Sequence, residues 1–373
     1  TSNEASPVHV YANKGVYTVT LTASGPGGVD QEIRSDYITV YQKVTADFIT
    51  EEITGVAPHT AQFTNLTTGD FSSLLWDFGD GSASAEANPT HVYTAAGTYT
   101  VSLTASGDGG NDVETKTAYI TVYAPIVTEF TYTPTSGIAP LEVQFTNAST
   151  GDYDTLAWDF GDGGSSTEAN PIHTFAVGGT YTVTLTASGL GGEDIQTHTV
   201  EVFTAVNANF NADVTLGIAP LTVQFTDLST GDYDTLAWDF GDGSTSAESN
   251  PSHVYTTAGT YTVSLTAFGD GGIDVETKTA YITVYTAVSA NFSADVTSGV
   301  APLTVQFTDL STGDYDILAW DFGDSSTSTE SNPSHVYTAA GIYTVTLTAS
   351  GDGGNDVETK TAYITVYTPI VAE

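Results

Sequence analysis

W-D-F-G-D-G occupies residues 76–81, recurs at 158–163 and 238–243, and returns as W-D-F-G-D-S at 320–325. The four tryptophans of these copies are the only ones in the chain, and they stand 82, 80 and 82 residues apart. A period this regular is typical of tandem structural units rather than of one large fold. The chain therefore predicts a series of units of about 80 residues, each near the lower size limit for a self-sufficient core.

Each copy of the hexapeptide predicts a buried strand that runs into a tight turn. Trp76 and Phe78 are two residues apart, so a strand places both on one face. A leucine two residues before each tryptophan extends that face (Leu74, Leu156, Leu236 and Leu318). The Asp-Gly pair favours a turn, because glycine adopts positive φ without strain. The D-F-G triplet of protein kinases is excluded, since no glycine-rich nucleotide loop or H-R-D segment accompanies it.

The remainder of each unit alternates apolar and hydroxyl residues. In the third unit, Leu221, Val223 and Phe225 alternate with threonine or glutamine, and residues 261–266 and 280–284 continue the pattern. Such alternation predicts antiparallel strands with one solvated face. Many short strands between glycine-rich turns predict a β-sandwich. We expect an all-β chain, a tandem array of immunoglobulin-like antiparallel sandwiches that very short linkers hold as an elongated rod.

The motif combination is specific to one family. W-D-F-G-D-G is followed by N-P-x-H-x-Y and then by A-G-x-Y-T-V-x-L-T-A, and this order resembles the polycystic kidney disease (PKD) domain family over almost the whole chain. The resemblance implies seven-stranded immunoglobulin-like sandwiches of the kind found in animal receptors, secreted bacterial hydrolases and archaeal surface-layer proteins. It also implies an extracellular or cell-surface location.

The repeat pattern predicts the domain boundaries. Residues 1–43 match only the C-terminal half of a unit, since T-S-N-E-A-S-P-V-H-V-Y corresponds to the segment that ends at Tyr255. Complete units are expected at 44–123, 124–203, 204–285 and 286–367. Residues 368–373 repeat the opening of the second unit and predict either the start of a further repeat or a strand-donating tail. We expect a longer natural array.

Charge excludes several partners. The 45 acidic residues outweigh six basic ones and give a net charge of −39. Nucleic acid needs lysine and arginine for its phosphates and is excluded, and an anionic membrane surface is disfavoured. The acidity predicts either a salty medium, bound divalent cations or plain solubility. The chain has no cysteine, no apolar run long enough to span a bilayer and no visible signal peptide.

Histidine and tyrosine recur at fixed places that predict structural roles. Each histidine stands alone, about 80 residues from the next, which disfavours a metal site; we expect these rings to pack by the core tryptophan (Trp76, Trp158, Trp238 and Trp320 with His91, His173, His253 and His335). The tyrosine after each glycine resembles the tyrosine corner of sandwich domains (Tyr99, Tyr181, Tyr261 and Tyr343). His59 and His198 fall outside the pattern and are expected to be exposed.

Two loops of each unit collect carboxylates. One precedes the tryptophan strand and the other lies late in the unit (Asp152, Asp154, Asp232, Asp234, Asp314 and Asp316; then Asp270, Asp274, Asp352 and Asp356). Hard oxygen ligands of this kind suit Ca²⁺, and the resemblance adds that some collagenase PKD domains hold calcium in similar loops. The D-x-D-G form seen there is missing, so a solvated acidic rim is the alternative. Calcium is the one candidate cofactor.

The remaining sites are weaker. Asn65, Asn147 and Asn291 begin N-glycosylation sequons. Asp77 and Asp80 resemble a catalytic carboxylate pair, but a role as turn acceptors is simpler, and no nucleophile–base–orienter trio recurs beside them. Tyrosines of the last strand (Tyr37, Tyr119, Tyr281 and Tyr363) are expected to be exposed and to suit stacking on sugars or on a neighbouring chain.

Three functions remain open. The first is a non-catalytic structural or adhesive rod that builds a surface layer, sheath, filament or stalk with copies of itself or other surface proteins. The second is the accessory array of a large secreted protease or glycosidase, which presents substrate to a catalytic domain. The third is a carbohydrate- or protein-binding module. Near-identical repeats favour the first, because units three and four differ at only 12 of 82 positions and selection for length needs copies in series. We expect no enzymatic activity in this segment.

Overall fold

The computed structural model describes residues 1–370 and contains strands β1 to β35 and no helix in that range. The tail predicted at 368–373 therefore lies partly outside the described residues. Residues 1–370 contain no helix long and apolar enough to cross a membrane. The described chain falls into two compact units, Thr1–Thr135 with Glu142–Thr174 and Thr180–Val200, and Ser136–Leu141 with Phe175–Gly179 and the residues from Glu201 on. The all-β class predicted from the sequence is confirmed.

The strands follow the repeat pattern, and we call residues 44–123, 124–203, 204–285 and 286–367 repeats 1 to 4. The N-terminal segment has β1 (Gly15–Gly25) and β2 (Gly28–Val40). Repeat 1 has β3 (Phe48–Ile49), β4 (Thr54–Val56), β5 (His59–Gln62), β6 (Thr64–Asn65), β7 (Ser73–Asp77), β8 (Ala83–Ser84), β9 (Thr90–Tyr93), β10 (Gly97–Gly107) and β11 (Gly110–Tyr123). Repeat 2 has β12 (Phe130–Thr133), β13 (Ser136–Ile138), β14 (Leu141–Asn147), β15 (Thr155–Asp159), β16 (Ser165–Ser166), β17 (Ile172–Phe175), β18 (Gly179–Gly189) and β19 (Gly192–Phe203).

The last two repeats have the same elements. Repeat 3 has β20 (Phe210–Ala212), β21 (Leu216–Ile218), β22 (Leu221–Asp227), β23 (Thr235–Asp239), β24 (Thr245–Ser246), β25 (Ser252–Tyr255), β26 (Gly259–Gly269) and β27 (Gly272–Tyr285). Repeat 4 has β28 (Phe292–Ala294), β29 (Ser298–Val300), β30 (Leu303–Asp309), β31 (Ile317–Asp321), β32 (Thr327–Ser328), β33 (Ser334–Tyr337), β34 (Gly341–Gly351) and β35 (Gly354–Tyr367).

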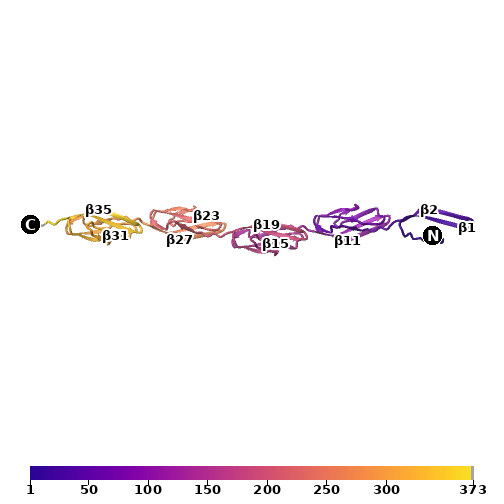
Figure 1. Ribbon diagram of the computed structural model, residues 1–373, viewed down its shortest axis with the longest axis horizontal. Coiled ribbons are helices and arrows are strands. Elements are labelled where there is room, and N and C mark those ends of the chain that lie inside the picture. The colour runs from indigo at the N-terminus through magenta and orange to yellow at the C-terminus, as the bar shows by residue number, and fades with distance from the viewer. Residues whose placement is uncertain (371–373) are drawn as a thin grey trace. The chain divides into compact units, whose positions relative to one another are not determined.

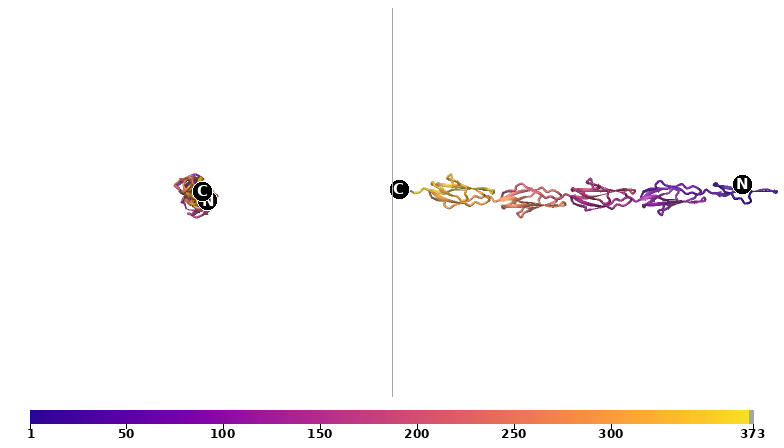
Figure 2. Two further views of the ribbon diagram at one scale, coloured as in Figure 1. Left: turned by 90° about the vertical axis from the view of Figure 1, so that its left-hand side faces the viewer. Right: turned by 90° about the horizontal axis from the view of Figure 1, so that it is seen from below.

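Repeats 3 and 4 are sandwiches of two sheets (Figure 1). The larger sheet of repeat 3 has the order β21-β27-β26-β23-β24, and the smaller has β20-β22-β25; repeat 4 repeats this with β29-β35-β34-β31-β32 and β28-β30-β33. All pairs are antiparallel except the short edge strand, β21 or β29, which runs parallel to the last strand. Figure 2 shows the same ribbon from two further sides. Repeat 1 has the same larger sheet, β4-β11-β10-β7-β8.

The hexapeptide forms the centre of each sandwich, as its alternation predicts. In repeat 1, Trp76 and Phe78 are buried together, and the indole nitrogen donates a hydrogen bond of 2.9 Å to the Glu86 carbonyl. That bond satisfies the indole N–H, which is the one polar group of the tryptophan side chain and would otherwise be buried without a partner. The indole ring contacts Phe48 and Phe63 of the facing layer, with ring centroids 5.2 and 5.6 Å away. The tryptophan therefore joins the two sheets.

A β-bulge explains the unequal period. The β10–β11 register shifts between Tyr99 and Val101, and Ala118 takes φ 51° opposite the shift. Ala280 and Ala362 do the same in repeats 3 and 4, at φ 52° and 54°. Strand β19 of repeat 2 has 12 residues where β11 has 14, and its sequence lacks the Ala-Tyr pair of the bulge. The loss of these two residues explains why Trp158 and Trp238 stand 80 residues apart, whereas the other tryptophans stand 82 apart.

The N-terminal hairpin repeats the β10–β11 pairing without a facing sheet in the structure. Gly15 pairs with Val40 as Gly97 pairs with Val122, and the register shift falls at the matching tyrosine. Leu21 is 69 % exposed, whereas its counterpart Leu103 is fully buried. Residues 15–40 thus present an apolar face that the complete repeats cover with their first strands.

Candidate functional site

The joints between successive repeats have the same set of hydrogen bonds each time. At each joint, one residue that lies one or two positions after the last strand of the preceding unit bonds the repeat that follows, and we call it the linker residue. Its amide donates to the Oδ2 atom of an aspartate in the following repeat, and its carbonyl accepts from the amide of the same aspartate. The pairs are Gln42–Asp70, Ala124–Asp152, Thr204–Asp232 and Thr286–Asp314. We call this arrangement the linker clamp.

The distances are similar in all four clamps. The donations to Oδ2 measure 2.7, 2.6, 2.6 and 2.5 Å, and the return bonds from the aspartate amide measure 3.1 Å each. Hydrogen bonds to a charged acceptor are about twice as strong as neutral ones. Both backbone groups of the linker residue are therefore fixed to the repeat that follows.

A glycine of the long hairpin completes the clamp. The Gly353 amide donates to the Asp314 carbonyl at 2.8 Å, and its carbonyl accepts from Val288 at 3.0 Å. A Cβ built on Gly353 would lie 2.1 Å from the Thr286 carbonyl oxygen, far inside van der Waals contact. The same position in the other repeats is equally close, at 2.0 to 2.2 Å (Gly109, Gly191 and Gly271). Only glycine lets the hairpin approach the linker this closely.

Side chains of the preceding repeat also reach the clamp. The Tyr285 side chain, at the end of repeat 3, lies close to the Asp352 carboxylate at the hairpin tip of repeat 4, and this negative charge raises the pKa of Tyr285. Ile218 of repeat 3 lies beside the next hairpin, because a Cβ on Gly354 would stand 3.1 Å from its Cδ1 atom. The acidic loops predicted from the sequence therefore meet at the joints.

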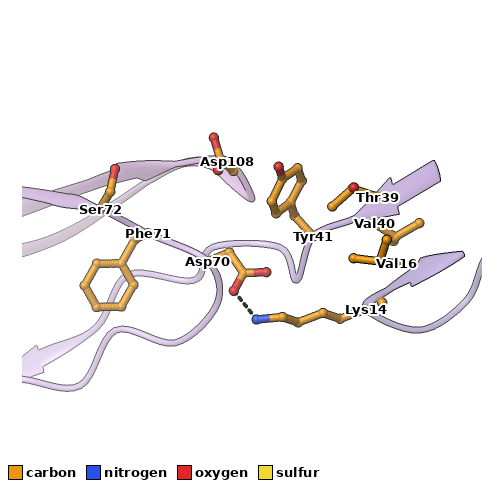
Figure 3. Close-up of a pocket in the computed structure, with 10 residues that line it drawn as sticks. Lys14, Val16, Thr39, Val40, Tyr41, Asp70, Phe71, Ser72 and Asp108 are labelled. Atoms are coloured by element: carbon orange, nitrogen blue, oxygen red, sulfur yellow. Dashed lines mark hydrogen bonds and ion pairs between the residues drawn. The ribbon is translucent and has the colours of Figure 1, made fainter. Parts of the chain in front are cut away.

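An open hollow of about 340 Å³ lies at the first joint (Figure 3). Lys14 reaches across it to the Asp70 carboxylate, while Tyr41, Phe71 and Asp108 line its walls. The hydrogen bond from Lys14, together with that from the Gln42 amide, holds the pKa of Asp70 below its ordinary value. The clamp aspartate of this joint therefore stays ionised over a wide pH range.

The turn after each tryptophan strand forms a second recurrent cluster. The Asp242 carboxylate accepts from Nε2 of His253 at 2.8 Å, and the imidazole stacks on Phe240 with ring centroids 4.2 Å apart. Burial raises the pKa of Asp242, but the hydrogen bonds from His253 and Ser244 outweigh it, so this pKa lies below its ordinary value. The pKa of Asp80, Asp162 and Asp324 is lowered in the same way.

This cluster has serine, histidine and aspartate but not the arrangement of a catalytic triad. In repeat 1 the Ser82 hydroxyl and the Asp80 carboxylate both contact the same nitrogen of His91, Nε2. A triad needs the carboxylate on Nδ1, so that Nε2 is free to take the serine proton. Here the aspartate blocks that atom, and Ser82 itself bonds Asp80. The contacts suit a turn brace rather than acyl transfer. The histidine stacks on phenylalanine, not on tryptophan as expected.

The other candidate carboxylates have backbone partners. Asp274 and Asp356 accept at Oδ2 from the amides of Ala208 and Ala290, 2.8 and 2.9 Å away. The clamp already uses Asp152, Asp232 and Asp314. The backbone amides of Asp154, Asp234 and Asp316 donate to carbonyls at the end of the neighbouring strand, and Asp270 and Asp352 lie at hairpin tips. Residues 1–370 contain no group of three or more acidic or histidine side chains that would hold a metal ion. Calcium stays a prediction.

The sequon asparagines differ in their surroundings. Asn147 is half-buried, its Oδ1 accepts from the Ser149 amide and its Nδ2 donates to the Tyr153 hydroxyl at 3.0 Å. Asn65 caps its turn in the same way through Thr67. Asn291 is exposed, and its Oδ1 accepts from Phe292. Glycosylation at these positions stays a prediction, and Asn291 has the most accessible amide.

The tyrosine stripe predicted on the last strand is not exposed in the complete repeats. The bulge turns Tyr119, Tyr281 and Tyr363 toward the sandwich edge, where each is half-buried and its hydroxyl accepts at 3.0 Å from a backbone amide at or just after the end of the first strand. A lysine then covers the ring: Lys278 lies 5.3 Å from the centroid of Tyr281 and 4.9 Å from that of Phe210. Only Tyr37, in the N-terminal hairpin, is exposed. The expected exposure was wrong for these three tyrosines, and stacking on sugars stays a prediction.

Repeat 2 replaces this lysine–tyrosine pair by a different one. His198 stands where the other repeats have lysine, and its ring meets Phe130 edge-on at 4.7 Å. Tyr132, from the first strand, replaces the deleted bulge tyrosine and donates to the Thr199 carbonyl at 2.9 Å. The His198 side chain is 35 % exposed, so the expected exposure is met only in part, because one side of the ring covers Phe130. The Tyr99 hydroxyl of repeat 1 donates to the carbonyl four residues upstream at 2.8 Å, as do Tyr261 and Tyr343.

Known proteins resemble this chain in short segments. Collagenase ColA of Bacillus cereus is 50 % identical over 54 residues, which are 14 % of this chain and 6 % of the collagenase. The pre-pro-metalloprotease PrtV of Vibrio cholerae is 39 % identical over 74 residues, 20 % of this chain and 8 % of PrtV. Human polycystin-1 is 29 % identical over 202 residues, 50 % of this chain and 4 % of polycystin-1. The chain thus spans less than a tenth of each of these relatives.

The chain also resembles a solved structure and matches one family profile. The I-band fragment I67–I69 of titin has a TM-score of 0.48 and 12 % identity, over 66 % of this chain and 99 % of the fragment. The profile of the PKD domain matches residues 45–122, 124–204, 204–284 and 286–366. These four matches cover far more than half of the sequence, and the chain is therefore a member of the PKD domain family.

Proposed function

We propose that this chain is a non-catalytic extracellular spacer, a stiff array of PKD repeats that builds a surface layer, sheath, filament or stalk. The linker clamp carries this proposal. A free residue between two domains has two soft backbone dihedrals, and ordering one residue costs about 1–2 kcal/mol. Here the charged hydrogen bonds of Asp314 and the close approach of Gly353 offset that cost at the joint. The result is a joint with little freedom to swivel.

The chemistry of the repeats supports a mechanical rather than a reactive role. In repeat 1 the Asp80 carboxylate and the Ser82 hydroxyl both contact Nε2 of His91, so that nitrogen is not free to act as a general base. The scarce cations are used internally, since Lys278 donates to the Phe210 carbonyl while lying over the Phe210 ring. Acidic side chains remain on the surface, which keeps an exposed array soluble.

Electron microscopy of the negatively stained full chain tests this proposal. We expect particles with one narrow distribution of end-to-end length, and a broader distribution when Asp232 and Asp314 are both changed to alanine. Asp227→Asn is a matched control: the side chain lies within a repeat, and asparagine already occupies the equivalent position, Asn147, in repeat 2. A wild-type chain as widely bent as the double variant would refute a stiff spacer.

The relatives favour a second candidate, the accessory array of a secreted protease. Segments of a collagenase and of PrtV are 50 % and 39 % identical to parts of this chain. On this proposal the repeats hold a fibrous protein substrate for a catalytic domain. Cosedimentation of the purified chain with collagen fibrils tests it: saturable binding supports the accessory role, and a chain that stays in the supernatant removes it.

A further inference from the structure

A lysine lies beside two carboxyl groups where the first strand of repeat 1 meets the last. The Nζ atom of Lys116 is 3.4 Å from Oδ1 of Asp47 and 3.8 Å from Oε1 of Glu114. Asp47 stands immediately before β3, whereas Lys116 and Glu114 belong to β11. The amine of the lysine, a nucleophile when it is uncharged, therefore lies next to the carboxyl group of a residue 69 positions away. We call these three residues the lysine trio of repeat 1.

Repeats 3 and 4 have the same trio with asparagine in place of the aspartate (Asn209, Glu276 and Lys278; Asn291, Glu358 and Lys360). Lys278 donates to the Phe210 carbonyl at 2.7 Å, and Oδ1 of Asn209 accepts from the Phe210 amide at 2.8 Å. Because the N–H and C=O groups of one strand residue point to the same side, the lysine and the asparagine approach Phe210 from the same side. Repeat 4 has both contacts through Phe292.

Repeat 2 lacks every member of the trio. Glu129, Gln196 and His198 stand at the three positions. Repeats 1 and 3 thus keep the trio whole, and repeat 2 has replaced it as a whole. The three trios also hold three of the six basic residues of a chain with 45 acidic ones. A lysine placed for charge alone needs no particular set of neighbours, so the recurrence indicates a use for the three residues together.

Aromatic rings hold the lysine of the trio in place. The Lys116 side chain is 24 % exposed, and its Nζ atom lies 5.0 Å from the ring centroid of Phe48 and 5.6 Å from that of Tyr119. The carboxyl carbon of Asp47 is one covalent bond from the oxygen that faces Nζ. Groups that a fold holds at roughly 3–3.5 Å react as if at very high local concentration. The Asp47 side chain is half-exposed, so a small leaving group can escape to water.

We propose that the lysine of each trio forms an intramolecular amide bond with the aspartate or asparagine. In repeat 1, Glu114 takes a proton from the Lys116 ammonium and passes it to the Asp47 carboxylate. The uncharged amine then attacks Cγ, and the new Nζ–Cγ bond replaces one Cγ–Oδ bond. A second proton leaves the nitrogen by the same route, and the departing oxygen, which has received both protons, is released as water. One ammonium and one carboxylate become one amide and one water.

The asparagine trios release ammonium instead of water. Nζ of Lys278 attacks Cγ of Asn209 after Glu276 has taken its proton, and the Cγ–Nδ2 bond breaks. The departing amide nitrogen takes the two protons that Nζ loses and leaves as ammonium. Neither reaction needs an oxidant or any group beyond the trio. A bond at Asn291 also removes the side-chain amide that glycosylation there would need.

The bond fastens each of these repeats near both of its ends. Asp47 and Lys116 stand close to the first and last residues of repeat 1, so a force that pulls on those ends passes through the new amide and bypasses the residues between them. The inference goes beyond the proposed function, because the bond forms within one repeat whatever the array supports.

Mass spectrometry of the intact, denatured full chain tests the bond. We expect the measured mass to lie below the mass of the sequence by about 18 Da for repeat 1 and by about 17 Da each for repeats 3 and 4. Lys116→Arg should abolish the loss of about 18 Da, and Lys278→Arg one loss of about 17 Da. Arginine keeps the charge beside the ring, as Arg34 does next to Tyr37 at the equivalent position of the N-terminal hairpin. Digestion of the wild-type chain should yield a branched peptide that contains residues 47 and 116.

Two controls separate the amide bond from other losses of mass. Lys43→Arg changes an exposed lysine outside the trios, and we expect the full deficit to remain. Glu276→Gln should leave repeat 3 folded, as hydrogen exchange of its peptides checks, but without its loss of about 17 Da. A wild-type chain with the mass of its sequence overturns the proposal. A deficit that persists in both Lys116→Arg and Lys278→Arg overturns it as well and assigns the loss to cyclic imides at Asp-Gly pairs, which also lack one water.

Discussion

Replacing Gly353 by alanine separates the steric part of the linker clamp from ordinary hairpin stability. The new Cβ would stand 2.1 Å from the Thr286 carbonyl oxygen and 3.0 Å from the Asp314 carbonyl oxygen. Because normal contacts need more than 3 Å, the hairpin and the linker must move apart by about 1 Å. No positive φ is involved at this glycine, so the strain is purely steric.

The magnitude follows from the bonds that share this contact. The displacement disrupts three backbone hydrogen bonds: Gly353 to Asp314, Val288 to Gly353, and Asp314 to Thr286. At about 1 kcal/mol each, the local structure of the joint loses about 2–3 kcal/mol. Amide exchange that proceeds through local opening should accelerate by roughly 30- to 150-fold at Val288 and Asp314.

Hydrogen exchange of the full chain, read by mass spectrometry on peptides from 286–316, measures this effect. Gly27→Ala is the matched control, because Gly27 occupies the same position in the β1–β2 hairpin and has nothing within 4 Å of an added Cβ. We expect that control to leave exchange in its own hairpin unchanged. Exchange at the repeat 4 joint within about threefold of wild type in Gly353→Ala would refute the steric clamp.

Three further predictions concern strain, acid and calcium. Ser325 takes φ 81° where the other repeats have glycine. Ser325→Gly should therefore stabilise repeat 4 by about 1 kcal/mol, and Gly243→Ser should destabilise repeat 3 by a similar amount. Hydrogen exchange in the peptides of each repeat measures both changes, and effects of the same sign in the two variants would contradict backbone strain at Ser325. The lowered pKa of Asp242 and its counterparts means that their stabilising contribution is complete above the ordinary pKa of 3.8 and is lost as pH falls through the folded value. The urea concentration at the unfolding midpoint, followed by circular dichroism, should therefore decrease as the pH is lowered below about 4. The decrease should be less steep in His253→Gln, which lacks one cause of the pKa shift. The same dependence on pH in both proteins would count against the stabilising role of the Asp242–His253 contact. Calcium, if it uses the paired acidic loops, should give heat in a titration of chelator-treated protein up to about 10 mM, and a flat titration would remove it.

Much of the fold is readable from local pattern. The repeat period, the strands and the buried pair Trp76 and Phe78 follow from residue spacing, because a strand sends alternate side chains to opposite faces. The tyrosine of each corner was also readable, and Tyr99 bonds a carbonyl only four residues away. Contacts this close in sequence depend on little beyond the local chain.

The hydrogen bonds at the joints could not be predicted from the sequence, although the aspartates that form them stand out in it. Asp314 looked like a candidate calcium ligand, yet its carboxylate and amide hold Thr286, which lies 28 residues away. The partner is a backbone group that every residue possesses, so no residue type marks it in the sequence. The recurring glycine at 353 was the available signal, and its reason appears only when the linker is brought against it.

The sequence by itself determined the modules: their number, their all-β class and the residues of each core, since these depend on periodicity and turn chemistry along the chain. The tertiary structure alone decided how the polar side chains are used. It directs the aspartates to linker amides, stacks His91 on Phe78 and turns Tyr281 and Lys278 inward. The physical reason is that an ionised or polar side chain takes the partner that folding brings within about 3 Å, and residues distant in sequence supply that partner.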